Sequence, residues 1–451
     1  MTESFEGKAD VIIVGGGSAG VSSAVAASRS GCSVILVERY GFLGGTAAAS
    51  MVGPMATFHT KSGKQIIGGI PEEIVLALIK NGGSPGFVKD TIGVCSYYVP
   101  FEPEILKLVL LTTAKKSGVK LLFHGWVYEV IQKKNKILGL KVITKGGPLI
   151  LKGKIFIDAS GDGDIASLCG VPFSLGDQNG RPQPMTLIFK LKQVNQKEIT
   201  EYMLSHPEEF HPETLFNELA NSSHIGVSGF FSLWKKGEQT GETHIPRDRL
   251  LFFSGVEPGE MMVNTTRIIH KNPINPWDLS EAEIEGREQL LSLLQFLKKR
   301  IPGFQNCVLA QAAAQVGIRE SRRIHGEYTL TEKDVLKGSK FKNAIARGAY
   351  PIDIHDPSGK KIVLKQIGGD GYYEIPYPCL IPLKISNLLI TGRCLSAAHE
   401  ALGSCRIQAT AMASGQAAGT AAALCIKEKR ETREIKIQTI QRKLREAGAV
   451  I

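Results

Sequence analysis

Short apolar runs alternate with small-residue stretches at the start of the chain. Residues 11–14 and 34–37 are uninterrupted apolar runs, and residues 18–30 between them are rich in Ala and Ser. Continuous apolar runs of this length are typical of buried parallel strands, whereas the longer stretch between them suits a helix. The pattern therefore predicts a strand–helix–strand unit with an acid, Glu38, where the second strand ends.

The turn after the first predicted strand has the spacing Gly15-x-Gly17-x-x-Gly20. In such a unit the first glycine makes a tight turn, the second admits a diphosphate close to the backbone, and the third lets helix and strand pack closely. The helix N-terminus offers free N–H groups and a positive dipole end to the diphosphate. Glu38 can accept hydrogen bonds from a ribose diol and would repel a 2′-phosphate. The unit predicts a dinucleotide site, with NAD and FAD both open; the alternative is a structural glycine-rich turn.

The pattern changes after this unit. Residues 71–80 and 103–117 are expected to be helices, each opened by a proline. Shorter runs then predict a strand and an antiparallel meander, over residues 119–123, 127–132, 137–144 and 149–151. Residues 154–158 form another apolar strand, which enters a second glycine-rich turn at residues 161–163.

The middle of the chain is different in character. Apolar strands are expected at residues 186–191 and 250–254, and polar helices around residues 197–205 and 213–221. A longer helix is predicted over residues 280–300, because Ser280 and Glu283 have the spacing of a capping box. This part is expected to be an inserted domain that shapes a substrate pocket.

The end of the chain returns to the first pattern. Residues 386–393 read as a buried strand ending at a glycine, and a small-residue helix follows from about Arg406. We therefore expect an α/β fold in which a discontinuous nucleotide-binding domain surrounds an inserted α+β substrate or cap domain. The expected boundaries are residues 1–170 and 378–451 for the first domain and 171–377 for the second, with 304–330 possibly packing back on the first.

Composition narrows the class of protein. The chain has 451 residues and a net charge of +11, and its basic pairs, such as Lys133-Lys134, are short and scattered, so nucleic acid is not the expected partner. The eight cysteines form no Cys-x-x-Cys, which argues against zinc ribbons, iron–sulfur modules and dithiol redox sites. Residues 407–426 carry no charge but are rich in Ala, Gly, Ser and Thr, which favours a buried helix over a membrane span. The polar N-terminus does not read as a signal peptide, and we expect a cytoplasmic protein.

Seven segments together resemble FAD-dependent oxidoreductases of the two-dinucleotide-binding-domain superfamily, distantly like the flavoproteins of fumarate reductase. They are VGGGSAG (14–20), ER-x-GFLGGT (38–46), KIFIDASGDGDIA (154–166), QPMTL (183–187), IRESRRIHG (318–326), YPIDIHD (350–356) and NLLITGRCLSAAHEALGSCRIQATAMASGQAAGTAAA (387–423). The first is common among nucleotide-binding proteins, and the last is far more specific. The resemblance implies a Rossmann-like domain with a parallel sheet and a meander.

The resemblance also implies that FAD is the cofactor and that particular residues bind it. Arg393 replaces the acid that follows the glycine in many relatives, so charge pairing with phosphate is an alternative role for it. The backbone near the start of the last helix would face the flavin pyrimidine edge. The implied cofactor-binding residues are Gly15, Gly17, Ser18, Ala19, Gly20, Glu38, Arg39, Gly44, Gly45, Thr46, Val127, Ala159, Ser160, Gly161, Gly392, Arg393, Ile407 and Gln408.

One arginine and three histidines are candidates for catalysis. The resemblance implies that Arg406 clamps a substrate carboxylate; the alternative is pairing with flavin or backbone. His399 and His355 could act as acid or base, with His59 a weaker candidate, although each histidine could be structural. No metal site is expected.

Other reactive or charged residues are expected to be structural. The charged residues 319–323 are expected to form an ion-pair network between domains. Cys394 and Cys405 are expected to be buried thiols.

These observations predict hydride transfer between FAD and a small polar or carboxylate-bearing substrate, with an unnamed electron donor or acceptor. A second glycine-rich nucleotide unit is absent from the sequence, which separates the chain from disulfide reductases. Two alternatives remain open: an RNA-modifying flavoprotein, which would use the basic surface, and an FAD-binding protein without redox turnover. A homo-oligomer is possible.

Overall fold

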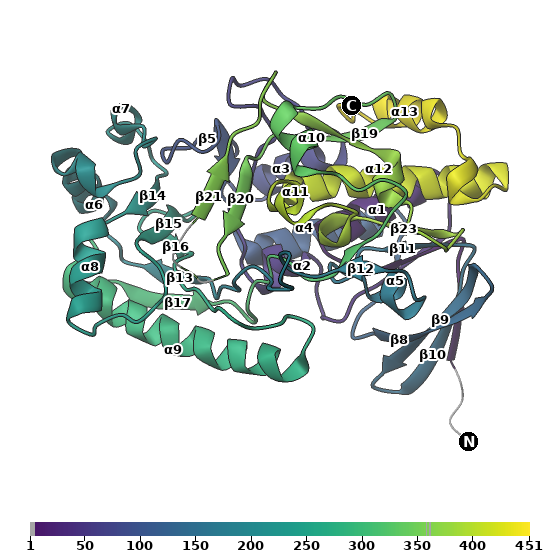
Figure 1. Cartoon of the computed structure of the whole chain (residues 1–451), viewed down its shortest axis with the longest axis horizontal. Coiled ribbons are helices and arrows are strands. Elements are labelled where there is room, and N and C mark those ends of the chain that lie inside the picture. The colour runs from purple at the N-terminus through teal and green to yellow at the C-terminus, as the bar shows by residue number, and fades with distance from the viewer. Residues whose placement is uncertain (1–4, 358, 360–361) are drawn as a thin grey trace.

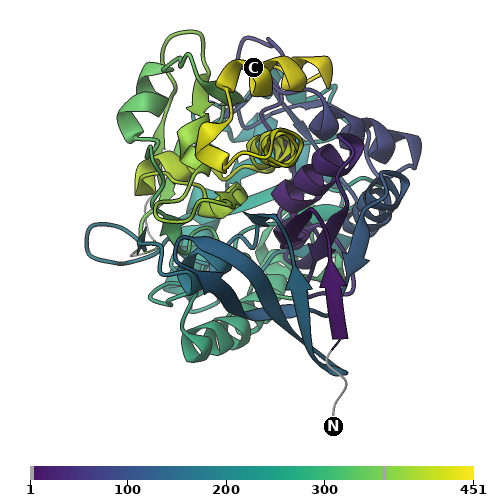
Figure 2. The same ribbon diagram turned by 90° about the vertical axis from the view of Figure 1, so that its right-hand side faces the viewer.

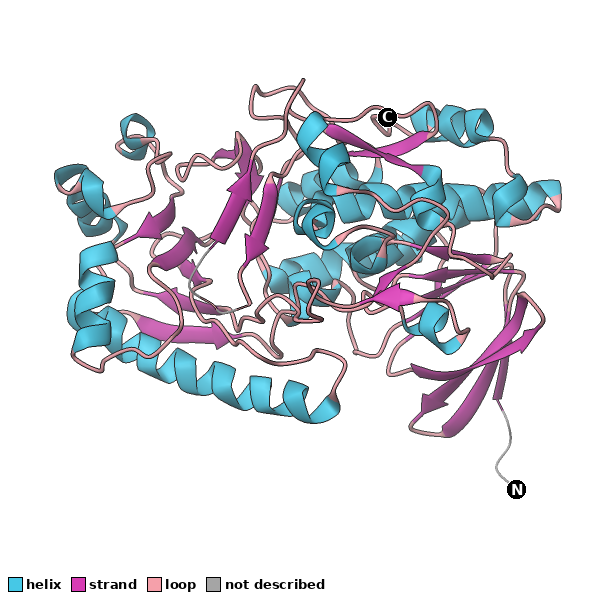
Figure 3. Cartoon of the chain, in the orientation of Figure 1, coloured by secondary structure: helices cyan, strands magenta, loops and turns pink. Residues whose placement is uncertain are grey.

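The structure is a computed structural model that describes residues 5–357, 359 and 362–451. In Figure 1 an antiparallel sheet and the helices α8 and α9 form the left side of the molecule, and a small meander lies at the lower right. A parallel sheet with a group of helices lies between these two parts. Figure 3 shows the same arrangement by element type.

The central parallel sheet has the strand order β23-β11-β2-β3-β7. Its strands are Leu388–Ile390, Ile155–Asp158, Val11–Val14, Val34–Val37 and Lys120–Leu122. Val14 pairs in register with Val37 on one side and with Asp158 on the other. The strands therefore end together, and this sets the glycine-rich turns and Glu38 at one edge of the sheet, where α/β proteins bind nucleotides.

Two small-residue helices from opposite ends of the chain pack together beside this sheet. They are α1 (Ser18–Arg29) and α12 (Gln408–Glu428), and the two views in Figures 1 and 2 show them side by side. A Cβ atom on Gly415 would lie 2.2 Å from the carbonyl oxygen of Ala19, and Ser23 donates a hydrogen bond to the Gly415 carbonyl at 2.9 Å. The uncharged run 407–426 is thus mainly a buried helix, as predicted. None of the helices among the described residues is long and apolar enough to cross a membrane.

The meander forms a four-stranded sheet of order β1-β10-β9-β8. Its strands are Phe5–Lys8, Gly147–Lys152, Lys136–Thr144 and Trp126–Lys133. The last three were predicted to within two residues at each end. Strand β1 was not predicted, because its sequence FEGK has no apolar alternation. Its backbone groups pair with those of β10, which is far away in the sequence.

A second core lies in the middle of the chain. The antiparallel sheet β14-β15-β16-β13-β17 comprises Gly226–Gly229, Leu250–Ser254, Met261–Val263, Phe189–Lys192 and Val308–Ala312. Helices pack around it: α6 (Gln196–Ser205), α7 (Phe216–Leu219), α8 (Phe231–Gln239) and α9 (Pro276–Arg300). Its buried apolar residues come almost entirely from residues 185–316, whereas buried residues between 330 and 381 join the core of the parallel sheet.

The predicted start of α9 at Ser280 is wrong. The helix begins at Pro276, and the side chain of Asn275 accepts hydrogen bonds from the N–H groups of Trp277 and Asp278. Ser280 instead donates to the Pro276 carbonyl inside the helix. Asn followed by Pro is an equally good helix start, with proline at the first position, where no N–H is needed.

The remaining elements connect these sheets. The helices are α2 (Gly45–Ala49), α3 (Ile70–Lys80), α4 (Pro103–Lys116), α5 (Asp164–Leu168), α10 (Glu332–Lys337), α11 (His399–Cys405) and α13 (Ile437–Glu446). The strands are β4 (Met55–Ala56), β5 (Val88–Lys89), β6 (Tyr97–Val99), β12 (Phe173–Ser174), β18 (Arg323–Ile324), β19 (Ala344–Gly348), β20 (Ile352–His355), β21 (Ile362–Lys365) and β22 (Tyr373–Pro376). The hairpin β20–β21 lies between the two cores and carries part of the site (Figure 1).

Candidate active site

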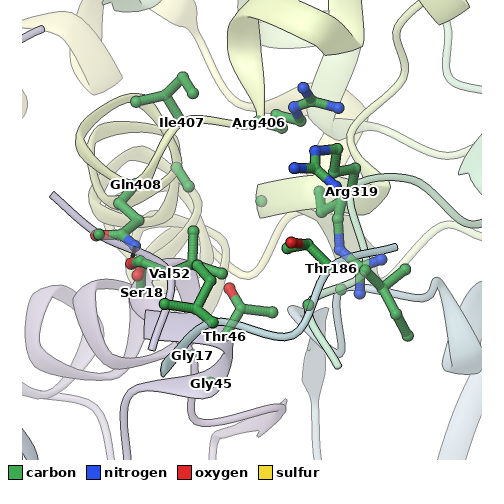
Figure 4. A pocket seen from close by; sticks show the side chains of 18 of the residues that line it. Gly17, Ser18, Gly45, Thr46, Val52, Thr186, Arg319, Arg406, Ile407 and Gln408 are labelled. Carbon is green, nitrogen blue, oxygen red and sulfur yellow. Dashed lines mark hydrogen bonds between the residues drawn. The ribbon is translucent and has the colours of Figure 1, made fainter. Parts of the chain in front are cut away.

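A cavity of about 480 Å³ runs from the glycine-rich turns of the parallel sheet to the antiparallel sheet. Figure 4 shows Gly17, Gly45 and Thr46 on one side of it and Arg319 and Thr186 on the other, with Gln408, at the start of α12, on the side of the glycines. The cavity therefore has a nucleotide-type end and an arginine-rich end, built by residues far apart in the sequence.

Glycines let two stretches of backbone approach each other at the nucleotide end. A Cβ on Gly45 would lie 2.8 Å from the Cα of Gly17, and one on Gly20 would lie 1.8 Å from the Gly15 carbonyl oxygen. Gly17 caps α1 without a side-chain hydrogen bond, so the first N–H groups of the helix are open to a ligand. This cradle fits a diphosphate. Gly20 and Gly44 do not line the cavity; Gly20 packs the helix, and Gly44 donates to the Gly16 carbonyl at 2.8 Å.

The Glu38 carboxylate is fixed at the end of β3. It accepts hydrogen bonds from the backbone N–H groups of Gly16, at 2.6 Å, and Tyr40, at 2.9 Å. Each carboxylate oxygen keeps a lone pair for a sugar hydroxyl. Burial raises the pKa of Glu38, opposed by these two N–H groups. The guanidinium of Arg39 lies over the rings of Tyr40 and Trp126, 4.9 and 5.3 Å from their centres, and Val127 lines the cavity nearby.

The second glycine-rich turn closes over the cavity. Ala159, Ser160 and Gly161 line it, together with Gly392 and Arg393 from the end of β23. Arg393 donates a hydrogen bond to Asp162 at 2.7 Å. Asp162 is therefore the charge partner of Arg393 in this structure. Burial would raise the pKa of Asp162, but the charges of Arg393 and Arg39 and the hydrogen bond from Ser321 together lower it.

The start of α12 faces the middle of the cavity. Ile407 and Gln408 line it, and Ile407 caps the helix without a side-chain hydrogen bond. Gln408 donates its side-chain N–H to the Val52 carbonyl, while its Oε1 is buried and has no hydrogen-bond partner among the described residues. An unpartnered acceptor beside open helix N–H groups fits the edge of a ring that both donates and accepts hydrogen bonds.

Arg406 and Arg319 lie next to each other at the other end of the cavity (Figure 4). Arg406 donates to the Gln183 side chain at 2.9 Å and to the Asp353 carbonyl at 3.1 Å. Arg319 donates to the Pro184 carbonyl at 2.7 Å and makes no ion pair in the described structure. Burial lowers the pKa of Arg319 to about 9, and repulsion from Arg406 adds to this shift.

His355 lines the cavity between two charged partners. Its Nδ1 lies 2.7 Å from Nη2 of Arg267, and its Nε2 lies 3.2 Å from the Asp353 carboxylate. Burial lowers the pKa of His355 well below its ordinary value. Burial would raise the pKa of Asp353, but the His355 hydrogen bond and the charges of Arg406 and Arg319 hold it well below its ordinary range.

His399 does not line the cavity. Its Nδ1 lies 2.9 Å from the carboxylate of Glu320, which also pairs with Arg323. Burial, aided by Arg323, lowers the pKa of His399 to about 4. His59 does not line the cavity either, and its ring packs edge-on against Phe87.

The charged side chains of segment 319–323 have two different environments. Arg322 pairs with Asp164 at 3.0 Å, and Arg323 pairs with Glu320 of the same segment, so these residues form ion pairs; that the pairs connect two domains stays a prediction. The predicted ion pairing is wrong for Arg319, whose side chain enters the cavity. Cys394 and Cys405 are buried thiols, as predicted, and burial raises the pKa of both.

Sequence reasoning missed two other arginines of the cavity. Arg247 and Arg249 precede strand β15 and both line the cavity wall formed by the antiparallel sheet. Only their alternate spacing before an apolar strand could have indicated that they share a face. Within the described ranges, no group of three or more His, Cys, Asp or Glu side chains could hold a metal ion.

Comparison with known proteins shows the family to which the chain belongs. A family model described as FAD dependent oxidoreductase matches residues 10–444. The flavin-dependent brominase Bmp2 superposes with a TM-score of 0.50 at 14% identity, over 98% of this chain and 83% of the brominase. A geranylgeranyl bacteriochlorophyll reductase-like protein from Thermoplasma acidophilum gives a TM-score of 0.49 at 13% identity, over 98% and 83% of the two chains. At sequence identities this low, the similarity shows a common fold and nothing more. A search of curated proteins gave no match.

Proposed function

Because this chain belongs to the FAD-dependent oxidoreductase family, we propose that it transfers a hydride between FAD and a small organic anion held by Arg406 and Arg319. The family makes the chain an FAD enzyme; the substrate class is the proposal. Bound FAD supplies the redox chemistry, and the residues of the chain hold, orient and shield the reactants.

Glu38, the glycine cradle and the start of α12 fit FAD in that order, from its adenosine end to its flavin ring. The cradle would hold the diphosphate, and Glu38 the ribose of the adenosine part. The N–H groups at the start of α12, with the free Oε1 of Gln408, would hold the polar edge of the flavin ring. The positive end of a helix at this edge stabilises negative charge on the reduced ring.

One observation carries the substrate class: Arg406 and Arg319 lie next to each other on the side of the cavity away from the glycine cradle (Figure 4). Arg319 donates to a backbone carbonyl, and Arg406 donates to a carbonyl and a side-chain amide, with one carboxylate, that of Asp353, 3.7 Å from Arg406. Each guanidinium therefore keeps N–H donors that a carboxylate or similar oxyanion can accept in a bidentate manner. An anion would also relieve the repulsion between the two cations.

His355 acts in this proposal as a positioning residue. Its Nδ1 accepts from Arg267, because a guanidinium can only donate, and its Nε2–H then donates to Asp353. Neither nitrogen is free to take a proton from a substrate. The ring instead holds Asp353 in place, and Asp353 in turn holds Arg406.

Apolar side chains also line the cavity, among them Val52, Ile362, Leu364 and Phe253. A dry site strengthens each charge–charge interaction and protects reduced flavin from side reactions. The alternative of an RNA partner receives no support from the basic cluster at the end of α9, where Lys299 and Arg300 both pair with Glu242.

The test is an anaerobic screen of small carboxylates and uncharged analogues against the purified yellow protein, followed by bleaching of the flavin absorption. We expect bleaching by one or more anionic compounds, and its loss in Arg406→Met with the flavin spectrum retained. Bleaching only by uncharged compounds, or unchanged bleaching in Arg406→Met, would remove the clamp from the mechanism.

A further inference from the structure

Arg247 is a buried cation that makes no ion pair with any residue that the structure describes. It is 2% exposed and lines the cavity on the antiparallel sheet side. Its Nη1 donates to the backbone carbonyl of Asn264 at 3.0 Å, but Nε and Nη2 have no hydrogen-bond partner among the described residues. Buried charged groups are normally paired and fully hydrogen-bonded, because desolvation without compensation is costly. This side chain therefore lacks a structural partner that it needs.

The charges around Arg247 increase this cost. Burial lowers the pKa of Arg247 well below its ordinary value, and repulsion from Arg267, Arg319 and Arg249 lowers it further. The nearest acid, Asp248, is occupied, because it binds both Nε and Nη2 of Arg249 at 2.8 and 2.7 Å.

Neutral hydrogen-bonding groups connect Arg247 with the proposed substrate clamp. The Asn264 side chain lies 3.3 Å from the Thr186 hydroxyl, and Thr186 lies near Arg319 on the same wall (Figure 4). Asn264 and Thr186 both line the cavity. Arg247, Asn264 and Thr186 thus form a polar stretch that continues from Arg319 along the wall.

We propose that Arg247 forms a second oxyanion subsite, with Asn264 and Thr186, and that the substrate carries two anionic groups. This inference rests on the proposed function. One anionic group of the substrate binds Arg406 and Arg319, and the other accepts hydrogen bonds from Nε and Nη2 of Arg247. The fork of these two donors matches a carboxylate or a phosphate. Leu251 and Phe253 line the same wall and provide apolar contact for the carbon skeleton between the two groups.

The experiment uses the FAD-loaded protein and four probes: propanoate, with one carboxylate, and butanedioate, pentanedioate and hexanedioate, with two. Dissociation constants come from the change in flavin absorption on titration. We expect at least one dicarboxylate to bind 10-fold or more tightly than propanoate. Arg247→Met should reduce that preference to less than threefold and leave propanoate affinity and FAD content unchanged. Arg247→Lys, which keeps the charge, should retain part of the preference.

Two further measurements separate the possible failures. Ligand-free Arg247→Met should melt no lower than the unmodified protein, because it loses an uncompensated buried charge. Arg442→Met, on the exposed face of α13, is the matched control and should change nothing. An unchanged preference in Arg247→Met, no preference for any dicarboxylate, or loss of FAD from Arg247→Met overturns the subsite and leaves the clamp standing. Retained propanoate binding in Arg406→Met overturns the clamp, and with it the subsite.

Discussion

A guanidinium N–H of Arg267 donates to Nδ1 of His355 at 2.7 Å, and this contact sets the tautomer of the imidazole. The proton must then be on Nε2, where it faces Asp353. A histidine that looks from the sequence like an acid–base catalyst is, in this environment, a neutral link between a cation and an anion.

The first prediction concerns the pH dependence of catalysis. Since burial lowers the pKa of His355 well below its ordinary value of 6.5, its ring should not titrate between pH 6.5 and 8. His355→Gln should slow substrate-driven flavin reduction about 10-fold, through misplacement of Asp353 and Arg406, and leave the shape of the pH–rate profile unchanged. Stopped-flow measurement across this range checks it. If one limb of the profile disappeared in the variant, His355 would itself be exchanging a proton.

The second prediction concerns the glycine cradle. Gly45→Ala would bring a Cβ within 2.8 Å of the Gly17 Cα, so it should narrow the diphosphate site and weaken FAD binding by at least 10-fold. Gly63→Ala is the matched control: Gly63 also has a positive φ, but its added Cβ would meet nothing within 4 Å. Both variants carry about 1 kcal/mol of backbone strain, and only the first should lose flavin, measured by absorbance after gel filtration. Equal flavin loss from both would make strain the cause.

The third prediction concerns stability in acid. The pKa of His399 is lowered to about 4 in the folded protein, so the unfolded chain binds the proton more readily. The stabilisation from His399 is complete above pH 6.5 and is lost as the pH falls from there to about 4, which amounts to about 2 kcal/mol at pH 5. Thermal melting should therefore show a smaller acid destabilisation in His399→Gln than in the unmodified protein. A parallel decline in both would assign the acid sensitivity to other groups.

The fourth prediction separates neighbouring arginines of one segment. Arg322→Met should lower stability by about 1 kcal/mol, because Asp164 loses its partner, and should leave anion binding intact. Arg319→Met should leave the melting temperature unchanged or higher and weaken propanoate binding at least 10-fold, because Arg319 has no acidic partner to lose within the part of the chain described. Melting curves and flavin titrations of the pair test this division. The reverse result would place the anion site at Arg322.

The sequence predicts those parts of the fold that depend on local periodicity. The strand–turn–helix–strand unit at residues 11–37 and the meander strands follow from the spacing of apolar and glycine residues, so the sequence predicts them correctly. Strand β1 and the start of α9 were missed because polar backbone pairing and an Asn-Pro cap leave little periodic signal.

The arginine end of the cavity could not be predicted in the same way. Arg319 lies in a cluster of charges whose sequence does not tell which side chain faces the cavity and which faces an acid. Arg247 becomes significant only through what surrounds it in three dimensions, namely the lack of a free carboxylate among its described neighbours. Recognition of such a residue requires contacts between strands that are distant along the chain.

The contact between α1 and α12 has a consequence for the biogenesis of the protein. Ser23 and Gly415 are joined across 392 positions of the sequence, and Gln408 and Ala411 of α12 also line the cavity. During translation the N-terminal half of the site therefore emerges long before its partner helix. We expect flavin capture to wait until the ribosome has nearly completed the chain: stalled nascent chains that end before Leu388 should bind no FAD, and chains released in full should bind it.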